Sequence, residues 1–309
     1  MCGIAGVIYR DGARDVGRDM TLMLQSMKHR GPDSTGYALY GPVTDLVVMR
    51  FKLADANDRR DFEFMERLRR SQREVEARLV ELGAEIADVQ QETEYAFRVA
   101  FRYDGDLKTI ADYVEDIPRC EVLSLGRSLE IVKDLGDAES VATQYHLADF
   151  VGTHAIGHVR MATESDVDIS GAHPYWAYPF SDVAVVHNGQ LTNYWQWKRR
   201  LERAGHRFQS MCDSEIIAVY LAEKMSGGAS LEDAMHDSLD DLDGVFTYIA
   251  VSADALGVAK DEMAAKPLVL YEGDDLVALA SEEIAIRAII DREIETYDPY
   301  EREVLVWHR

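Results

Sequence analysis

Residues 157–164 read GHVRMATE, follow directly on an apolar segment at 151–156, and place Arg160 among small and β-branched residues. A strand built in this way carries a guanidinium group to the end of a β-sheet. Residues 1–6, MCGIAG, and residues 183–189, VAVVHNG, are its expected partners, the second being a buried strand that runs into a turn. Together the three segments predict one site with a thiol, an oxyanion donor and an arginine that binds a carboxylate.

Length and composition indicate a globular protein. The chain has 309 residues, a length that allows one large domain or two small ones. Its hydrophobic content of 47% is ordinary for a soluble globular protein. No apolar run approaches the ~20 residues of a membrane-spanning helix, and the N-terminus lacks the pattern of a signal peptide. We therefore expect a cytoplasmic protein with no membrane contact. The irregular spacing of Cys2, Cys120 and Cys212 predicts neither a disulfide framework nor a metal site.

The chain is strongly acidic. Its 33 Lys and Arg residues against 56 Asp and Glu residues give a formal net charge of -23. Such a surface repels phosphate backbones, so no nucleic acid partner is expected. Solubility is the simplest reason for the charge, and a basic partner subunit is the alternative.

Strand patterns outnumber helical ones, and the helices come in pairs between strands, which favours an α+β layered sandwich over a doubly wound parallel sheet. Residues 29–36, HRGPDSTG, predict a loop, and residues 37–40 and 46–51 predict a hairpin. The other strands are expected at 2–9, 151–156, 183–187, 245–251, 267–271, 276–280 and 304–307, and the helices near 20–27, 194–204, 214–224 and 231–239.

Residues 52–119 have a different composition and predict an inserted α/β lobe. Residues 59–82 are rich in Arg and Glu with apolar residues on one helical face, and a single coiled-coil segment is the rival interpretation. Strict alternation at 94–103 predicts a half-buried strand, followed by a helix at 107–114 and a strand at 120–125.

Cys2 is the candidate nucleophile. Its small neighbours predict removal of Met1, which would leave a thiol and a free α-amine on one residue. An α-amine with a pKa of roughly 7.7–8.0 is partly neutral near pH 7 and can act as the base. A Met1 that stays in place would block this amine. The alternative role is that of a small buried apolar residue.

Asn188 and Gly189 are candidates for an oxyanion hole, because an amide and a backbone N–H at a tight turn supply two donors. A simple Asn-Gly hairpin turn is the alternative.

Arg160 can hold a carboxylate with two hydrogen bonds, and Asp213 can bind an ammonium group or cap the helix that follows it. A carboxylate site and an ammonium site around a thiol describe an α-amino acid acylated at Cys2, and glutamine fits.

The motifs MCGIAGV, HRGPDSTG, GHVRMATES, HNGQLTNY and CDSEIIAVYLA resemble the class II glutamine amidotransferases over about residues 1–50 and 120–285. The resemblance implies an N-terminal-nucleophile (Ntn) hydrolase fold: a four-layer αββα sandwich of two antiparallel sheets, here a single domain over 1–309 with the lobe inserted. It also implies hydrolysis of glutamine to glutamate and ammonia through a γ-glutamyl thioester.

Roles for individual residues follow from the resemblance. Cys2 is the implied nucleophile, Asn188 and Gly189 form the oxyanion hole, and Arg160 binds the carboxylate. The remaining implied substrate ligands are Asp213 for the amine, Thr163 beside Arg160, and Arg30 in a mobile loop that closes over glutamine.

The sequence departs from the hexosamine and purine branches of the family, because Glu164 stands where sugar-aminating relatives carry His, and Cys212 precedes Asp213. The insertion and the segment GRSLEIVKDLG are similar to stand-alone amidotransferase subunits of glutamate-synthase-like complexes, N-methylglutamate synthase in particular. The partner synthase subunits are then expected to carry FMN and iron–sulfur clusters, with no cofactor in this chain. A free-standing γ-glutamyl amide hydrolase and a catalytically silent scaffold are the alternatives.

Overall fold

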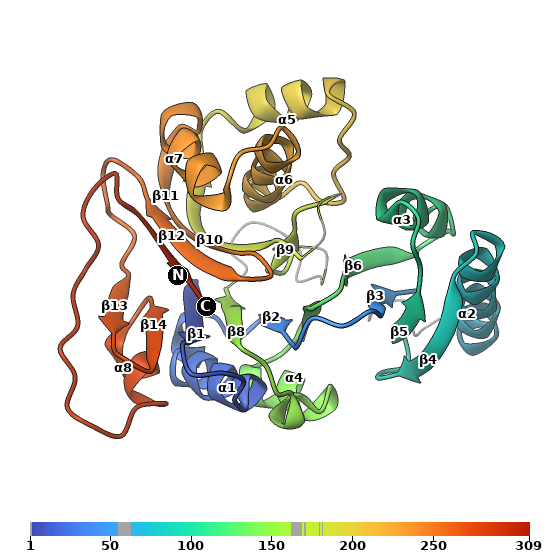
Figure 1. The fold of residues 1–309 in the computed structure, drawn as a ribbon, viewed down its shortest axis with the longest axis horizontal. Coiled ribbons are helices and arrows are strands. Elements are labelled where there is room, and N and C mark those ends of the chain that lie inside the picture. Colours follow the sequence, from blue (N-terminus) through green and yellow to red (C-terminus); the bar gives the residue numbers. More distant parts are fainter. Residues whose placement is uncertain (1, 55–62, 162–168, 170, 179, 181) are drawn as a thin grey trace.

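The fold is described by a computed structural model that covers residues 2–54, 63–161, 169, 171–178, 180 and 182–309. Two large antiparallel sheets stack face to face, and a third, smaller sheet stands at one side of them (Figure 1). Among these residues no helix is long and apolar enough to cross a membrane.

The first sheet has six strands, and the N-terminal strand β1 lies inside it, hydrogen-bonded to β14 on one side and β8 on the other. β1 consists mainly of small and β-branched residues, and all seven of its residues are buried. The order is β13 (Val269–Glu272), β14 (Leu276–Ala280), β1 (Gly3–Tyr9), β8 (His154–Arg160), β2 (Ser34–Tyr40) and β7 (Leu129–Leu135).

The second sheet has five strands and faces β1 and β8 of the first. Close approach of the sheets depends on Gly6 in β1, where a Cβ atom would stand only 3.2 Å from Leu256 in the facing sheet. The order is β15 (Val304–His308), β12 (Ala255–Lys260), β11 (Gly244–Val251), β10 (Ala184–Leu191) and β9 (Tyr175–Trp176).

Helices cover the outer face of each large sheet and complete four layers (Figure 1). The first sheet is covered by α1 (Val16–Ser26), α4 (Ala138–Gln144) and α8 (Glu283–Arg287), and the second by α5 (Tyr194–Arg203), α6 (Asp213–Ser226) and α7 (Leu231–Asp241). The apolar run in α6 is buried because this helix lies between β10 and its two neighbouring helices. The predicted α+β sandwich of antiparallel sheets is confirmed.

The third sheet belongs to the inserted lobe and has the order β4 (Glu85–Gln91), β5 (Ala96–Arg102), β3 (Val47–Lys52) and β6 (Glu121–Gly126). Two helices, α2 (Phe64–Glu81) and α3 (Leu107–Glu115), pack on this sheet. The sheet of the lobe therefore extends beyond the predicted range of 52–119, because β3 begins at Val47 and β6 ends at Gly126. The predicted hairpin of 37–40 with 46–51 is wrong, because β2 is paired on both edges within the first sheet and β3 pairs with β5 and β6.

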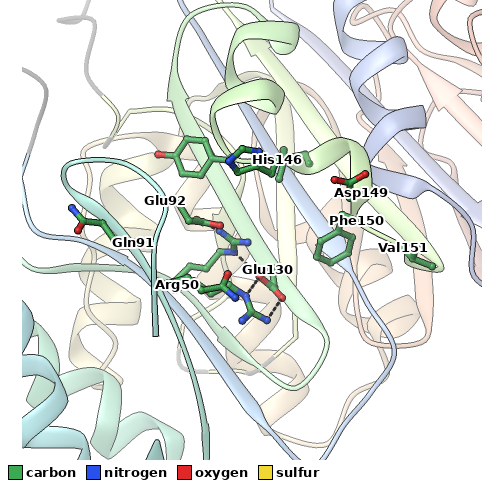
Figure 2. Close-up of a pocket in the computed structure, with 12 residues that line it drawn as sticks. Arg50, Gln91, Glu92, Glu130, His146, Asp149, Phe150 and Val151 are labelled. Atoms are coloured by element: carbon green, nitrogen blue, oxygen red, sulfur yellow. Dashed lines mark hydrogen bonds and ion pairs between the residues drawn. The ribbon is translucent and has the colours of Figure 1, made fainter. Parts of the chain in front are cut away.

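A buried cluster of charges joins the lobe to the first sheet beside a cavity of about 410 Å³ (Figure 2). Glu130 in β7 accepts hydrogen bonds from Arg50 Nε at 2.7 Å and from Arg98 Nε and Nη2 at 2.8 and 2.9 Å. Arg50 also donates to Glu92. Because both arginines belong to the lobe and Glu130 to the core, this cluster fixes one against the other.

Candidate active site

Cys2 lies immediately before β1 and lines a cavity of about 790 Å³. Two side chains hold its backbone carbonyl oxygen: Asn188 Nδ2 at 3.2 Å and Arg30 Nε at 3.0 Å. The residue is partly exposed, so its thiol is reachable. Burial raises the pKa of both Cys120 and Cys212, which keeps those two thiols protonated at neutral pH.

Five of the seven predicted site residues line this cavity together: Cys2, Arg160, Asn188, Gly189 and Asp213. The sheet register explains how the first two meet. Because β1 and β8 are antiparallel, with Gly3 opposite Val159, the start of β1 lies beside the end of β8. Arg160 is the last residue of β8, and its guanidinium lies against Gly171, where a Cβ atom would stand 2.9 Å from Nη2.

Asn188 and Gly189 lie inside strand β10 rather than in a turn, so the predicted turn is wrong. They pair with Thr247 and Phe246 of β11, and the strand continues to Leu191. Gly189 has a φ of 150°, and a Cβ atom there would stand 2.2 Å from the carbonyl oxygen of Val245. A glycine is therefore required at this position.

Asp213 is tied to β10 and is the first residue of α6. Its Oδ2 accepts a hydrogen bond from the backbone N–H of Leu191 at 2.8 Å, and its Oδ1 lies 3.9 Å from His187 Nδ1. The N-cap residue of α6 is Cys212, so the alternative role of Asp213 as the helix cap is wrong. The carboxylate is partly exposed and faces the cavity, where a cationic group could reach it.

Arg30 does not line the cavity. It is buried in a short 3-10 helix (Lys28–Arg30), and its Nη1 donates to Glu282 at 2.6 Å. Its Nε instead holds the backbone carbonyl oxygen of Cys2. The predicted loop 29–36 is wrong for residues 34–36, which belong to strand β2 between β8 and β7. Thr163 lies outside the described residues.

Three buried histidines, His158, His173 and His187, line the cavity and were not singled out from the sequence. The rings of His158 and His173 stack at a centroid distance of 4.1 Å, and those of His173 and His187 lie 6.4 Å apart. Burial lowers the pKa of His158 to about 3 and lowers the pKa of the other two as well. All three are therefore neutral at pH 7 and form a polar wall without charge.

His187 is fixed by Ser214, whose Oγ lies 2.7 Å from Nδ1, while its Nε2 has no hydrogen-bond partner among the described residues. His158 Nε2 is likewise unpaired there. Two buried imidazole nitrogens at the cavity can thus bond to a ligand. The sequence offered one indication of these two histidines, since His158 lies within the motif GHVR and His187 within HNG. No group of three or more His, Cys, Asp or Glu in the described part of the chain could hold a metal ion.

A family model described as "Glutamine amidotransferase domain" matches residues 158–288. The "Putative glutamine amidotransferase" of Methanothermobacter thermautotrophicus is 39% identical over 308 residues, which cover 97% of this chain and 98% of that protein. The "Glutamine amidotransferase-like protein GlxB" of Rhizobium meliloti is 34% identical, with 99% and 98% covered.

A solved structure with the same fold is the glutamine phosphoribosylpyrophosphate amidotransferase of B. subtilis, with a TM-score of 0.61 at 20% identity. The match covers 99% of this chain and 47% of that chain. Similarity over nearly the whole length of two relatives, together with this fold, establishes that the chain belongs to the class II glutamine amidotransferase family and is an enzyme of that kind.

Proposed function

We propose that Cys2 is the nucleophile of a glutaminase reaction in the cavity described above. The α-amine freed by removal of Met1 takes the thiol proton, and Sγ bonds to the side-chain amide carbon of glutamine. Collapse of the adduct breaks the C–N bond, and the nitrogen leaves as ammonia with that proton. Water then cleaves the γ-glutamyl thioester to give glutamate and the free thiol.

The observation that carries this proposal is the convergence of Cys2, Asn188 and Asp213 on one cavity from three separate elements. Asn188 Nδ2, already 3.2 Å from the Cys2 carbonyl oxygen, and the N–H of Gly189 would stabilise the oxyanion. Arg160 would bind the α-carboxylate of glutamine, and Thr163 is a second residue that the resemblance implies for this role. Asp213 would bind the α-ammonium group. The buried location of Arg30 favours a supporting role behind Cys2 over direct substrate binding.

The finer proposal is that the ammonia passes to a synthase subunit in a glutamate-synthase-like complex such as N-methylglutamate synthase. The support is the inserted lobe and the segment GRSLEIVKDLG, which resemble stand-alone amidotransferase subunits. FMN and iron–sulfur clusters would belong to the partner subunits.

Purification of the tagged full-length chain from its native host tests both levels of the proposal. We expect an N-terminus that begins at Cys2 by intact mass spectrometry, and co-purifying subunits with flavin absorbance and bound iron. A chain that purifies alone and hydrolyses glutamine at full rate without partners would contradict the complex. That result would favour a free-standing γ-glutamyl amide hydrolase.

A further inference from the structure

The rim of the cavity includes the segment 207–212 between α5 and α6, from which Met211 and Cys212 line the cavity. This segment is folded onto α6 by the buried carboxylate of Glu215. That carboxylate accepts hydrogen bonds from the backbone N–H groups of Gln209 and Ser210, both at 2.8 Å, and from Ser210 Oγ at 2.6 Å. The rim and the first turn of α6, which begins with Asp213, are therefore one rigid unit.

The inserted lobe holds this unit through Glu115, the last residue of α3. Its nearly buried carboxylate accepts hydrogen bonds from Val122 N–H in β6 at 2.7 Å and from Gln209 Nε2. Arg207 Nη2 lies 2.5 Å from the same carboxylate. Gln209 Nε2 also donates to the carbonyl oxygen of Val122 at 3.3 Å.

A second carboxylate of α3, Asp112, holds the other side of Arg207, with Nε at 3.3 Å. The Arg207 guanidinium stacks over the ring of Tyr178 at 4.1 Å, and the hydroxyl of Tyr178 donates to Asp112. Three contacts thus join α3 of the lobe to the segment that leads into Asp213: Gln209 and Arg207 with Glu115, and Arg207 with Asp112. Glu115 is costly to bury, since burial raises its pKa to about 7 despite the opposing effect of Arg207.

We infer that Glu115, Arg207 and Gln209 are positioning residues, which couple the inserted lobe to the glutamine site by fixing the rim and Asp213. The inference rests on the proposed function, in which Asp213 binds the α-ammonium group of glutamine. It gives the lobe a role in the reaction: a partner that displaces α3 would change glutamine binding without entering the cavity.

The test compares how fast two electrophiles label Cys2 in the full chain with Met1 removed, followed by mass spectrometry of the N-terminal peptide. Iodoacetamide needs only the thiol, whereas the diazoketone analogue of glutamine also needs the amino acid site. The variants are Glu115→Gln, Arg207→Ala and Gln209→Ala. Tyr113→Phe is the matched control, because it removes a hydrogen bond to Glu81 within the lobe and leaves the rim contacts intact.

We expect the three variants to slow labelling by the glutamine analogue by roughly 2- to 30-fold and labelling by iodoacetamide by less than about twofold. Tyr113→Phe should match the wild type with both reagents. In steady-state assays the variants should raise KM for glutamine more than they lower kcat.

Two results would overturn the inference and leave the proposed function in place. If the variants are labelled by the analogue at the wild-type rate, the lobe does not position the site. If both electrophiles slow equally, the contacts serve stability alone, which thermal unfolding of the same samples would register. A wild-type chain labelled by iodoacetamide but never by the analogue would reject the proposed function itself, and the inference with it.

Discussion

The carbonyl oxygen of Cys2 receives hydrogen bonds from two side chains, Arg30 and Asn188, that come from different layers of the fold. Both hydrogen bonds go to the backbone, so they do not depend on the sulfur atom. Cys2→Ala should therefore abolish glutamine hydrolysis and leave the melting temperature within about 1–2 °C of wild type. Activity assays and thermal unfolding measure the two effects.

Cys212→Ala is the matched control, since this second cysteine lines the same cavity but burial keeps its thiol protonated. It should retain most of the turnover. Residual activity above about a tenth of wild type in Cys2→Ala would exclude Cys2 as the nucleophile.

Arg160 stands at the end of β8 with its guanidinium toward the cavity, where a planar fork can hold a carboxylate with two hydrogen bonds. Arg160→Lys keeps the charge but loses the fork, so we expect KM for glutamine to rise by about tenfold or more, with little change in stability. Steady-state kinetics measure this change. The control is Lys266→Arg, which makes the opposite exchange of side chains at another residue of the same cavity. It should leave KM for glutamine within about twofold of wild type. An unchanged KM in Arg160→Lys would mean that another residue holds the carboxylate.

At the scale of elements, alternation and β-branched residues were sufficient to predict most strands of the two large sheets, and helical periodicity predicted α5, α6 and α7. Pairing could not be predicted in this way. The Asn188-Gly189 pair favours a local turn, yet hydrogen bonds to β11 keep it inside a strand. Similarly, β2 and β3 are close in sequence but each finds its partners far along the chain.

In the candidate site, too, some residues could be predicted from the sequence and others could not. Five residues that line the cavity were predictable because each stands in a short motif with a chemical reason for its residue type. The buried histidines were not, since their stacking arises only when β8, β10 and the segment before β9 meet. Arg30 was predicted to contact substrate, and only the ion pair with Glu282 reveals that it is anchored behind Cys2.

The joint between lobe and core gives a prediction at this scale. Burial alone would raise the pKa of Glu130, but the guanidinium groups of Arg50 and Arg98 outweigh it and hold the pKa at about 2. Glu130→Gln would remove this charge from the buried guanidinium of Arg50, which keeps Glu92, and from the partly exposed guanidinium of Arg98. It should lower the free energy of unfolding by about 3 kcal/mol, measured by urea denaturation.

The comparison for Glu130→Gln is Arg102→Gln, which breaks the exposed ion pair of Arg102 with Asp45 in the same lobe. That change should cost less than about 1 kcal/mol. Equal effects of the two substitutions would show that the buried cluster adds nothing beyond an ordinary surface pair.

At the scale of the whole molecule, the response to acid depends on buried groups of opposite sign. Burial lowers the pKa of His154 to about 4 and also lowers those of the three cavity histidines, while burial raises the pKa of Glu92, Glu115 and Glu215. The two sets oppose one another between about pH 4.5 and 6.5. The total pH dependence of stability is therefore a poor test of any one of them.

A single substitution isolates the contribution of His154, which is buried far from the cavity with Nε2 2.7 Å from the carbonyl oxygen of Ser252. Its ordinary pKa of about 6.5 applies to the unfolded chain, so its neutral form stabilises the fold above pH 6.5. This contribution is lost as the pH falls from about 6.5 toward 4, because the unfolded chain then binds one more proton. His154→Gln should therefore reduce the slope of unfolding free energy against pH by about 1.4 kcal/mol per pH unit in that window.

The opposing carboxylates are present in both proteins and cancel in the comparison. His308→Gln, at an exposed histidine, should leave the slope unchanged, and a wild-type slope in His154→Gln would show that His154 is not neutral in the folded protein.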